Sequence, residues 1–156
     1  MSNVRPHMRD ATELEENLIH RFLAGEHSTL EALRMQAEAA SVKSREFTGV
    51  GVYVNFTVPP ELPRFGPSDL IFGDVNLELA NAEPGVCALL YVEHGALSFL
   101  ELVTSSGPWP EEPIVEKITY LKEVPVGNGF SLVPSEERHS EALARALRGR
   151  KGQGVV

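Results

Sequence analysis

A few polar residues have the types that could form a binding or catalytic site. Arg45 and Glu46 are adjacent in a predicted strand, Glu101 interrupts an apolar run, and Trp109 lies between two prolines. An arginine can hold an anionic group, a carboxylate can act as an acid or base, and a tryptophan can stack on a ligand. We therefore treat Arg45, Glu101 and Trp109 as one candidate pocket. A structural ion pair of Glu101 with Arg45 or Lys117 is the alternative.

A second candidate surface comes from alternation along residues 70–79. Val75, Leu77 and Leu79 occur at every second position and predict a buried face. Asp74 and Glu78 fall on the opposite face, which is then available to solvent or to a partner. Trp109 could add a rigid aromatic anchor to such a contact, although a loop tryptophan more often folds back over the core.

The sequence indicates no metal site, cofactor or catalytic residue. Glu16 and His20 lie four residues apart and His27 follows, but zinc needs three or four convergent ligands. The fingerprints for dinucleotide binding, phosphate-binding loops and nucleophile elbows are missing. The single cysteine, Cys87, occurs in an apolar run, so we expect a buried and unreactive thiol.

The charge narrows the classes of partner. The chain has 156 residues and a formal net charge of −8, with 14 Lys and Arg against 22 Asp and Glu. Acidity disfavours nucleic acid and anionic membrane surfaces. It is compatible with a basic protein partner, although acidity more often serves solubility. No signal-peptide pattern or long apolar run occurs, so we expect a cytoplasmic location.

The periodicity predicts an α+β fold with two N-terminal helices packed on an antiparallel sheet of about five strands, and a short C-terminal helix. Helices are expected from Thr12 and from Ser28, each with capping-box spacing. Strands are expected over 42–47, 50–58, 70–79, 86–92, 96–104 and 114–121, with a tight turn at 93–95, and a last helix after Ser135. Residues 1–11 are expected to form a flexible arm, 12–148 a single domain and 149–156 a disordered tail.

Several segments occur together in an order that is similar to a known group. The residues Ser44-Arg45-Glu46-Phe47-Thr48-Gly49-Val50-Gly51 precede Gly73-Asp74-Val75, then Gly95-Ala96-Leu97 with Leu100-Glu101, then Trp109-Pro110. Over roughly residues 18–121 the chain resembles a family of small uncharacterised bacterial proteins with one or two helices before such a strand. Short proteins with a similar ending also occur among the immunity proteins of bacterial toxin systems.

These observations lead to three functional hypotheses. The first is a non-enzymatic cytoplasmic binding or regulatory protein, such as an immunity-type inhibitor of a basic protein, with Trp109, Asp74 and Glu78 as contacts. The second is a small-ligand-binding domain or small enzyme with its pocket near Arg45, Glu101 and Trp109, and with Glu46 beside it. The third is a homodimeric subunit joined through a sheet edge or the helix pair.

Overall fold

A computed structural model describes residues 8–64 and 69–149 of the chain. Its elements are α1 (Glu13–Phe22), α2 (Ser28–Ala39), β1 (Ser41–Phe47), β2 (Gly51–Thr57), β3 (Leu70–Phe72), β4 (Val75–Leu79), β5 (Val86–Glu93), β6 (Ala96–Thr104), β7 (Val115–Val126), β8 (Gly129–Ser135) and α3 (Ser140–Arg148). The strands form one sheet in the order β1-β2-β6-β5-β4-β7-β8, and β3 also pairs with β5. All these strands pair antiparallel. The α+β class with an antiparallel sheet is therefore confirmed.

The predicted count of about five strands is wrong, because the described residues form a sheet of eight strands. The predicted strand over 70–79 is interrupted at Gly73-Asp74 and becomes β3 and β4. β7 runs on to Val126, and Gly127, with φ +58°, makes the turn into β8. The glycines and Pro134 hid β8 from pattern analysis, since both residue types weaken a strand prediction. The last helix accordingly begins at Ser140, later than the predicted start after Ser135.

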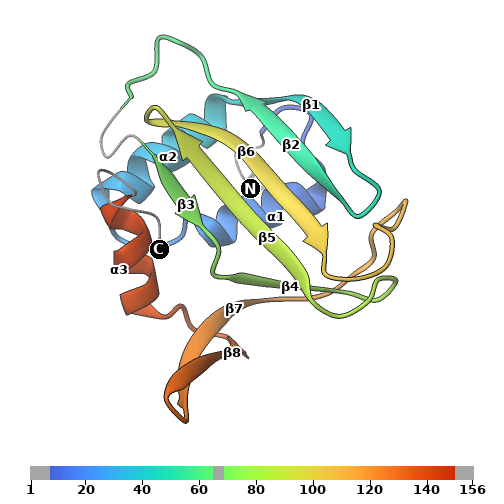
Figure 1. The fold of residues 1–156 in the computed structure, drawn as a ribbon. Helices are drawn as coiled ribbons and strands as arrows, with labels where there is room; N and C mark the ends of the chain where they lie inside the picture. The colour runs from blue at the N-terminus through green and yellow to red at the C-terminus, as the bar shows by residue number, and fades with distance from the viewer. Residues whose placement is uncertain (1–7, 65–68, 150–156) are drawn as a thin grey trace, which may run out of the picture.

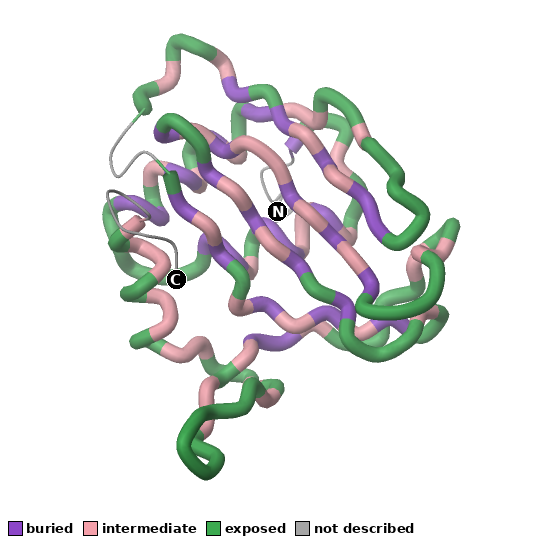
Figure 2. Tube along the Cα trace, viewed as in Figure 1, coloured by how far each residue is buried: buried purple, intermediate pink, exposed green. Residues whose placement is uncertain are grey.

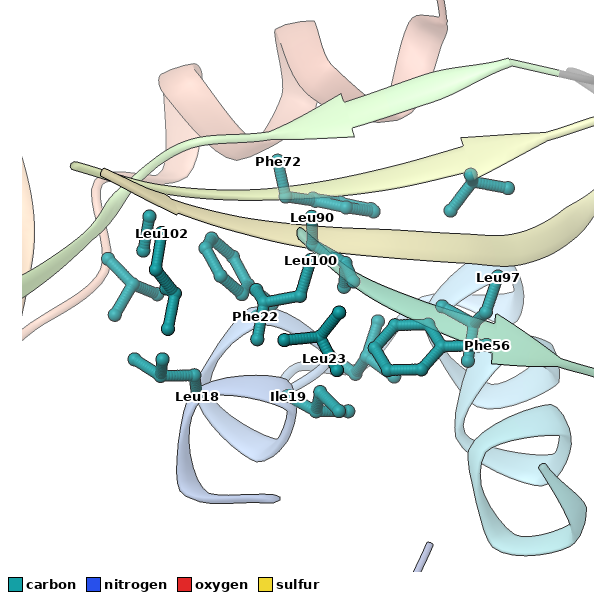
Figure 3. Packing of buried hydrophobic residues seen from close by; sticks show 14 of the residues in the cluster. Leu18, Ile19, Phe22, Leu23, Phe56, Phe72, Leu90, Leu97, Leu100 and Leu102 are labelled. Carbon is teal, nitrogen blue, oxygen red and sulfur yellow. The ribbon is translucent and has the colours of Figure 1, made fainter. Parts of the chain in front are cut away.

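The first two helices cover one face of the sheet, and on the other face α3 packs beside β3 and leaves β2, β5 and β6 without a covering helix. In Figure 1 both α1 and α2 lie behind the strands. Buried and part-exposed residues alternate along β5 and β6 in Figure 2, as expected for strands with one face in the core. Figure 3 shows Leu18 and Phe22 of α1 directed towards Leu100 and Leu102 of β6. The core therefore lies between this helix pair and the sheet.

Local capping signals fix the helix starts. Thr12 and Glu15 form the expected capping box, in which each side chain accepts the other residue's backbone N–H. The second helix is capped differently from the prediction: His27 is the N-cap, and its Nδ1 accepts the backbone N–H of Thr29. Ser28 is already helical, so the predicted capping box at Ser28 is wrong.

A buried amide fastens α2 to the predicted hairpin turn. Gln36 is 2% exposed, its Nε2 donates to the carbonyl of Gly95, and its Oε1 accepts the N–H of Leu97. The turn has positive φ at both His94 and Gly95, so the tight hairpin at 93–95 is confirmed. Gln36 thus supplies hydrogen bonds that the backbone could not find in an apolar core.

The predicted arm at 1–11 and tail at 149–156 lie mostly outside the described residues. In the described part of the arm, Met8 is buried, and the amide of Val42 donates to the carbonyl of Arg9 over 2.9 Å. This short segment therefore packs beside β1. Within the described chain, no helix is long and apolar enough to cross a membrane.

Candidate functional site

Three aromatic side chains form a row on the open face of the sheet. Tyr53 of β2, Phe99 of β6 and Tyr91 of β5 share this face, because their adjoining residues Val54, Leu100 and Leu90 point into the core. Tyr91 is directly opposite Phe99, whereas Tyr53 is opposite Glu101 and therefore diagonal to Phe99. The rings of Tyr91 and Phe99 stack with centroids 4.2 Å apart, and Tyr53 meets Phe99 edge-on at 5.9 Å. The row spans three strands and is only partly covered.

Glu101 lies within reach of the hydroxyl groups of both tyrosines. Its carboxylate accepts a hydrogen bond from Tyr53, which raises the pKa of that phenol above its ordinary value. The Tyr91 hydroxyl is 3.5 Å from Glu101 Oε1. Glu101 sits opposite Tyr53 in one pairing and opposite Leu89 in the other, so it is near the centre of the face. It makes no structural ion pair with Arg45 or Lys117 within the described residues.

Further carboxylates surround the row. Glu46 pairs across the strands with Tyr53 and accepts from the Asn55 amide over 2.8 Å. Glu93 accepts from Ser98 over 2.6 Å, and Glu78 accepts from Asn76 over 2.9 Å.

The hydrogen-bond donors to these carboxylates, Asn55, Ser98 and Asn76, are neutral. They therefore orient the carboxylates without cancelling their charge. Lys117, opposite Glu78 in the register, provides a positive charge on this side. We call Tyr53, Tyr91, Phe99, Glu46 and Glu101 the open-face cluster. An aromatic surface ringed by carboxylates suits a cationic group, through both charge and ring faces.

Arg45 lies on the other face of the sheet from Glu101. Arg45 is opposite Val54 in the strand register, and Val54 is buried in the core. The guanidinium of Arg45 binds the carboxylate of Glu15. Arg45 Nε donates to Glu15 Oε2 over 2.8 Å, and its Nη2 donates to Glu15 Oε1 over 2.6 Å. Burial opposes the charge of Arg45, but the hydrogen bond to Glu15 dominates and raises the arginine pKa. The guanidinium of Arg45 therefore links β1 to the first turn of α1.

The structure therefore brings together only two of the three residues of the predicted pocket, Arg45 and Trp109. Arg45 and Trp109 line one hollow of about 310 Å³ between α1, β1 and the loop after β6. Glu101 is absent from its lining, because the one-residue alternation of β6 directs it to the open face. The Trp109 amide donates to the carbonyl of Gly49, and the side chain packs partly buried against the core.

The carboxylate of Asp74 has a structural role in this fold and is not available to a partner protein. Two nitrogens of Arg138 donate to it, Nε to Oδ2 over 2.7 Å and Nη2 to Oδ1 over 3.0 Å. Their side chains are 10% and 13% exposed. The interpretation of Asp74 as a partner contact is therefore corrected, whereas Glu78 stays on the open face with Asn76.

The aromatic row was not predicted from the sequence, and the prediction for the cysteine is wrong. Tyr53, Tyr91 and Phe99 were detectable, since each occupies a position that alternation assigns to the non-core face. Cys87 lies on this face as well and is exposed, so the prediction of a buried thiol is wrong. Partial burial and the charge of Glu101 nevertheless raise the pKa of its thiol.

No metal centre accompanies the cluster: in the described segments, no three His, Cys, Asp or Glu residues gather to hold an ion. Comparison of the chain with protein-family models, curated proteins and solved structures finds no match in any of the three. The resemblance to a small bacterial family therefore stays a prediction.

Proposed function

We propose that this protein is a non-enzymatic binding protein whose open-face cluster holds a basic segment of another protein. The observation that carries the proposal is the row of three aromatic rings with Glu101 beside two of their hydroxyls. Lysine or arginine side chains of a partner could lie over the rings while the carboxylates balance their charge. The net charge of −8 would speed the encounter with such a partner.

The fold favours this face over the helical one. α3 packs only beside β3, so the strands that carry the open-face cluster have no covering helix. Their side chains are held at fixed spacing, which limits the entropy lost on binding. The chemistry also suits an inhibitor of a basic toxin, the class suggested by the sequence resemblance. A cytoplasmic location belongs to the same proposal.

The test is an affinity capture from lysate of the source organism with wild type, Phe99→Ser and Glu101→Gln. We expect one basic protein to be retained by wild type in stoichiometric amount, released by about 1 M salt, and lost with both variants, because screening is nearly complete at that ionic strength. Met35→Ser is the matched control, since Met35 is 62% exposed on α2. Equal retention by the Phe99 variant, or capture of an acidic protein, would contradict the proposal.

A second candidate is a homodimer formed through the β7–β8 hairpin. Val126, Phe130 and Leu132 are 58%, 64% and 53% exposed, and the hairpin extends away from the body of the fold (Figure 1). β8 ends the strand order and contains no charged residue, whereas exposed edges are usually protected by charges. Two copies of β8 could pair across a two-fold axis without bringing like charges together within the strand.

Light scattering across a concentration series tests this second candidate. We expect wild type to shift from monomer to dimer, and Leu132→Lys to remain monomeric at every concentration. Met35→Lys serves as the control with the same charge change at an exposed apolar site. Dimers that persist in the Leu132 variant would exclude β8 as the interface.

A further inference from the structure

An apolar hollow opens on the opposite side of the sheet from the open-face cluster. The hollow of about 310 Å³ lies against the first turn of α1, and Leu14, Phe47, Val52, Leu102 and Trp109 supply its apolar lining. The volume falls at the small end of the range of ligand sites. A neighbouring hollow of about 270 Å³ shares Phe47 and Trp109 with it. Phe47, Trp109 and Glu111 thus line both hollows.

The ring of Phe47 is unusual because it is 68% exposed on the edge strand β1. A large exposed aromatic beside the only tryptophan of the chain offers two ring faces to a molecule in the hollow. Ring faces carry negative electrostatic potential and attract cations. The apolar body of a ligand would meet Leu14, Val52 and Leu102 below them.

The charge of the hollow is negative. Arg45 is the cation in its lining, but two of its nitrogens already bind Glu15, which balances its charge. Glu13 and Glu111 also line the hollow, and within the described chain neither forms an ion pair. An anionic ligand would therefore meet two unbalanced carboxylates, whereas an organic cation would meet two complementary charges.

We propose that this hollow is a binding site for a small organic cation with an apolar body, such as an aryl-alkyl ammonium compound. Its ammonium group lies between the carboxylates of Glu13 and Glu111 and against the face of Trp109. Its hydrocarbon part fills the space above Leu14 and Val52. This site is separate from the open-face cluster and reverses the earlier expectation of an anion held by Arg45.

The single tryptophan makes the site directly measurable. Titration of the protein with 2-phenylethylammonium, followed by Trp109 fluorescence, is expected to give a saturable change. The neutral isostere 2-phenylethanol and the anion phenylacetate should bind at least about tenfold more weakly, a difference of about 1.4 kcal/mol. A response that does not saturate, or equal affinity for the alcohol, would overturn the proposal.

Charge-neutral variants locate the contact. Glu111→Gln should weaken binding of 2-phenylethylammonium by about fivefold to tenfold, since it removes one carboxylate of the pair. Glu112→Gln is the matched control, because Glu112 is next in the chain, exposed and not part of the lining. Equal weakening by both variants would show a general charge effect and reject the site. Glu101→Gln should leave this titration unchanged, which separates it from the test of the open-face cluster.

Discussion

At the residue scale, Gly51 is a position where the sheet leaves no room for a side chain. A Cβ built there would lie 2.1 Å from the Leu102 carbonyl oxygen and 2.9 Å from the Val103 Cα. Both atoms belong to the backbone of β6, so relief requires the β2–β6 ladder to move. We expect Gly51→Ala to lower the free energy of unfolding by about 2–4 kcal/mol, measured with urea.

The control for Gly51 is another strand glycine. A Cβ at Gly129 would meet nothing within 4 Å, and its φ is not positive. Gly129→Ala should therefore change the free energy of unfolding by less than about 0.5 kcal/mol. Equal effects of the two substitutions would show that close packing of β2 on β6 is not the cause.

The thiol of Cys87 gives a chemical reporter for the open face. Partial burial is the larger cause that raises the pKa of this thiol, and the negative charge of Glu101 raises it further. A larger protonated fraction means fewer thiolates at neutral pH, so we expect slower alkylation than for a free cysteine and a rate that rises at higher pH. Glu101→Gln should lower the thiol pKa and speed alkylation at neutral pH, measured with iodoacetamide.

A variant elsewhere checks the cause of that change. Glu112→Gln removes an equal charge from a residue outside the open-face cluster and should leave the alkylation rate near the wild-type value. A rate unaffected by Glu101→Gln would mean that this carboxylate does not act on the thiol.

At the element scale, two signals confined to neighbouring residues were predicted correctly, whereas the shared face of residues on distant strands was not. The Thr12–Glu15 box and the 93–95 turn depend on contacts three residues apart or fewer. By contrast, whether Arg45 and Glu101 share a face depends on the register of β1, β2 and β6. A one-residue difference in register exchanges the two faces, and single-sequence patterns do not determine it.

One ion pair, between Arg45 of β1 and Glu15 of α1, links this strand to the helix. Glu15 is 5% exposed, and Arg45 is its cation. Because Arg45→Met leaves the buried carboxylate unpaired, we expect a loss of about 2 kcal/mol in unfolding free energy, below the range for fully buried pairs since Arg45 is 29% exposed. Urea denaturation measures it.

A second substitution tests the pairing itself. Glu15→Gln in the Arg45→Met background should recover part of the loss, because the unpaired charge is removed while the amide still accepts from Thr12. Lys43→Met, an exposed change on the same strand, is the control and should be close to neutral. Additive losses in the double variant would argue against a direct ion pair.

At the scale of the whole molecule, Arg138 joins three distant parts of the chain. Its Nη2 donates to the carbonyl of Phe22, the last residue of α1, and its Nη1 to the carbonyl of Ala24, just after the helix. The same guanidinium binds Asp74 and lies 5.2 Å from the centre of the Tyr120 ring. Asp74 is 64 residues away, so its pairing with Arg138 could not be found by local pattern.

The prediction at this scale concerns Arg138→Met. The change leaves Asp74 without its cation and the carbonyls of Phe22 and Ala24 without their donor, in a site where both side chains of the ion pair are nearly buried. We expect a loss of about 3–5 kcal/mol in unfolding free energy. Arg145→Met is the matched control, since Arg145 pairs with Glu123 but is 48% exposed, and should cost about 0–1 kcal/mol. Similar losses for the two variants would show that burial does not set the strength of these pairs, and that Arg138 is no stronger a link than a surface ion pair.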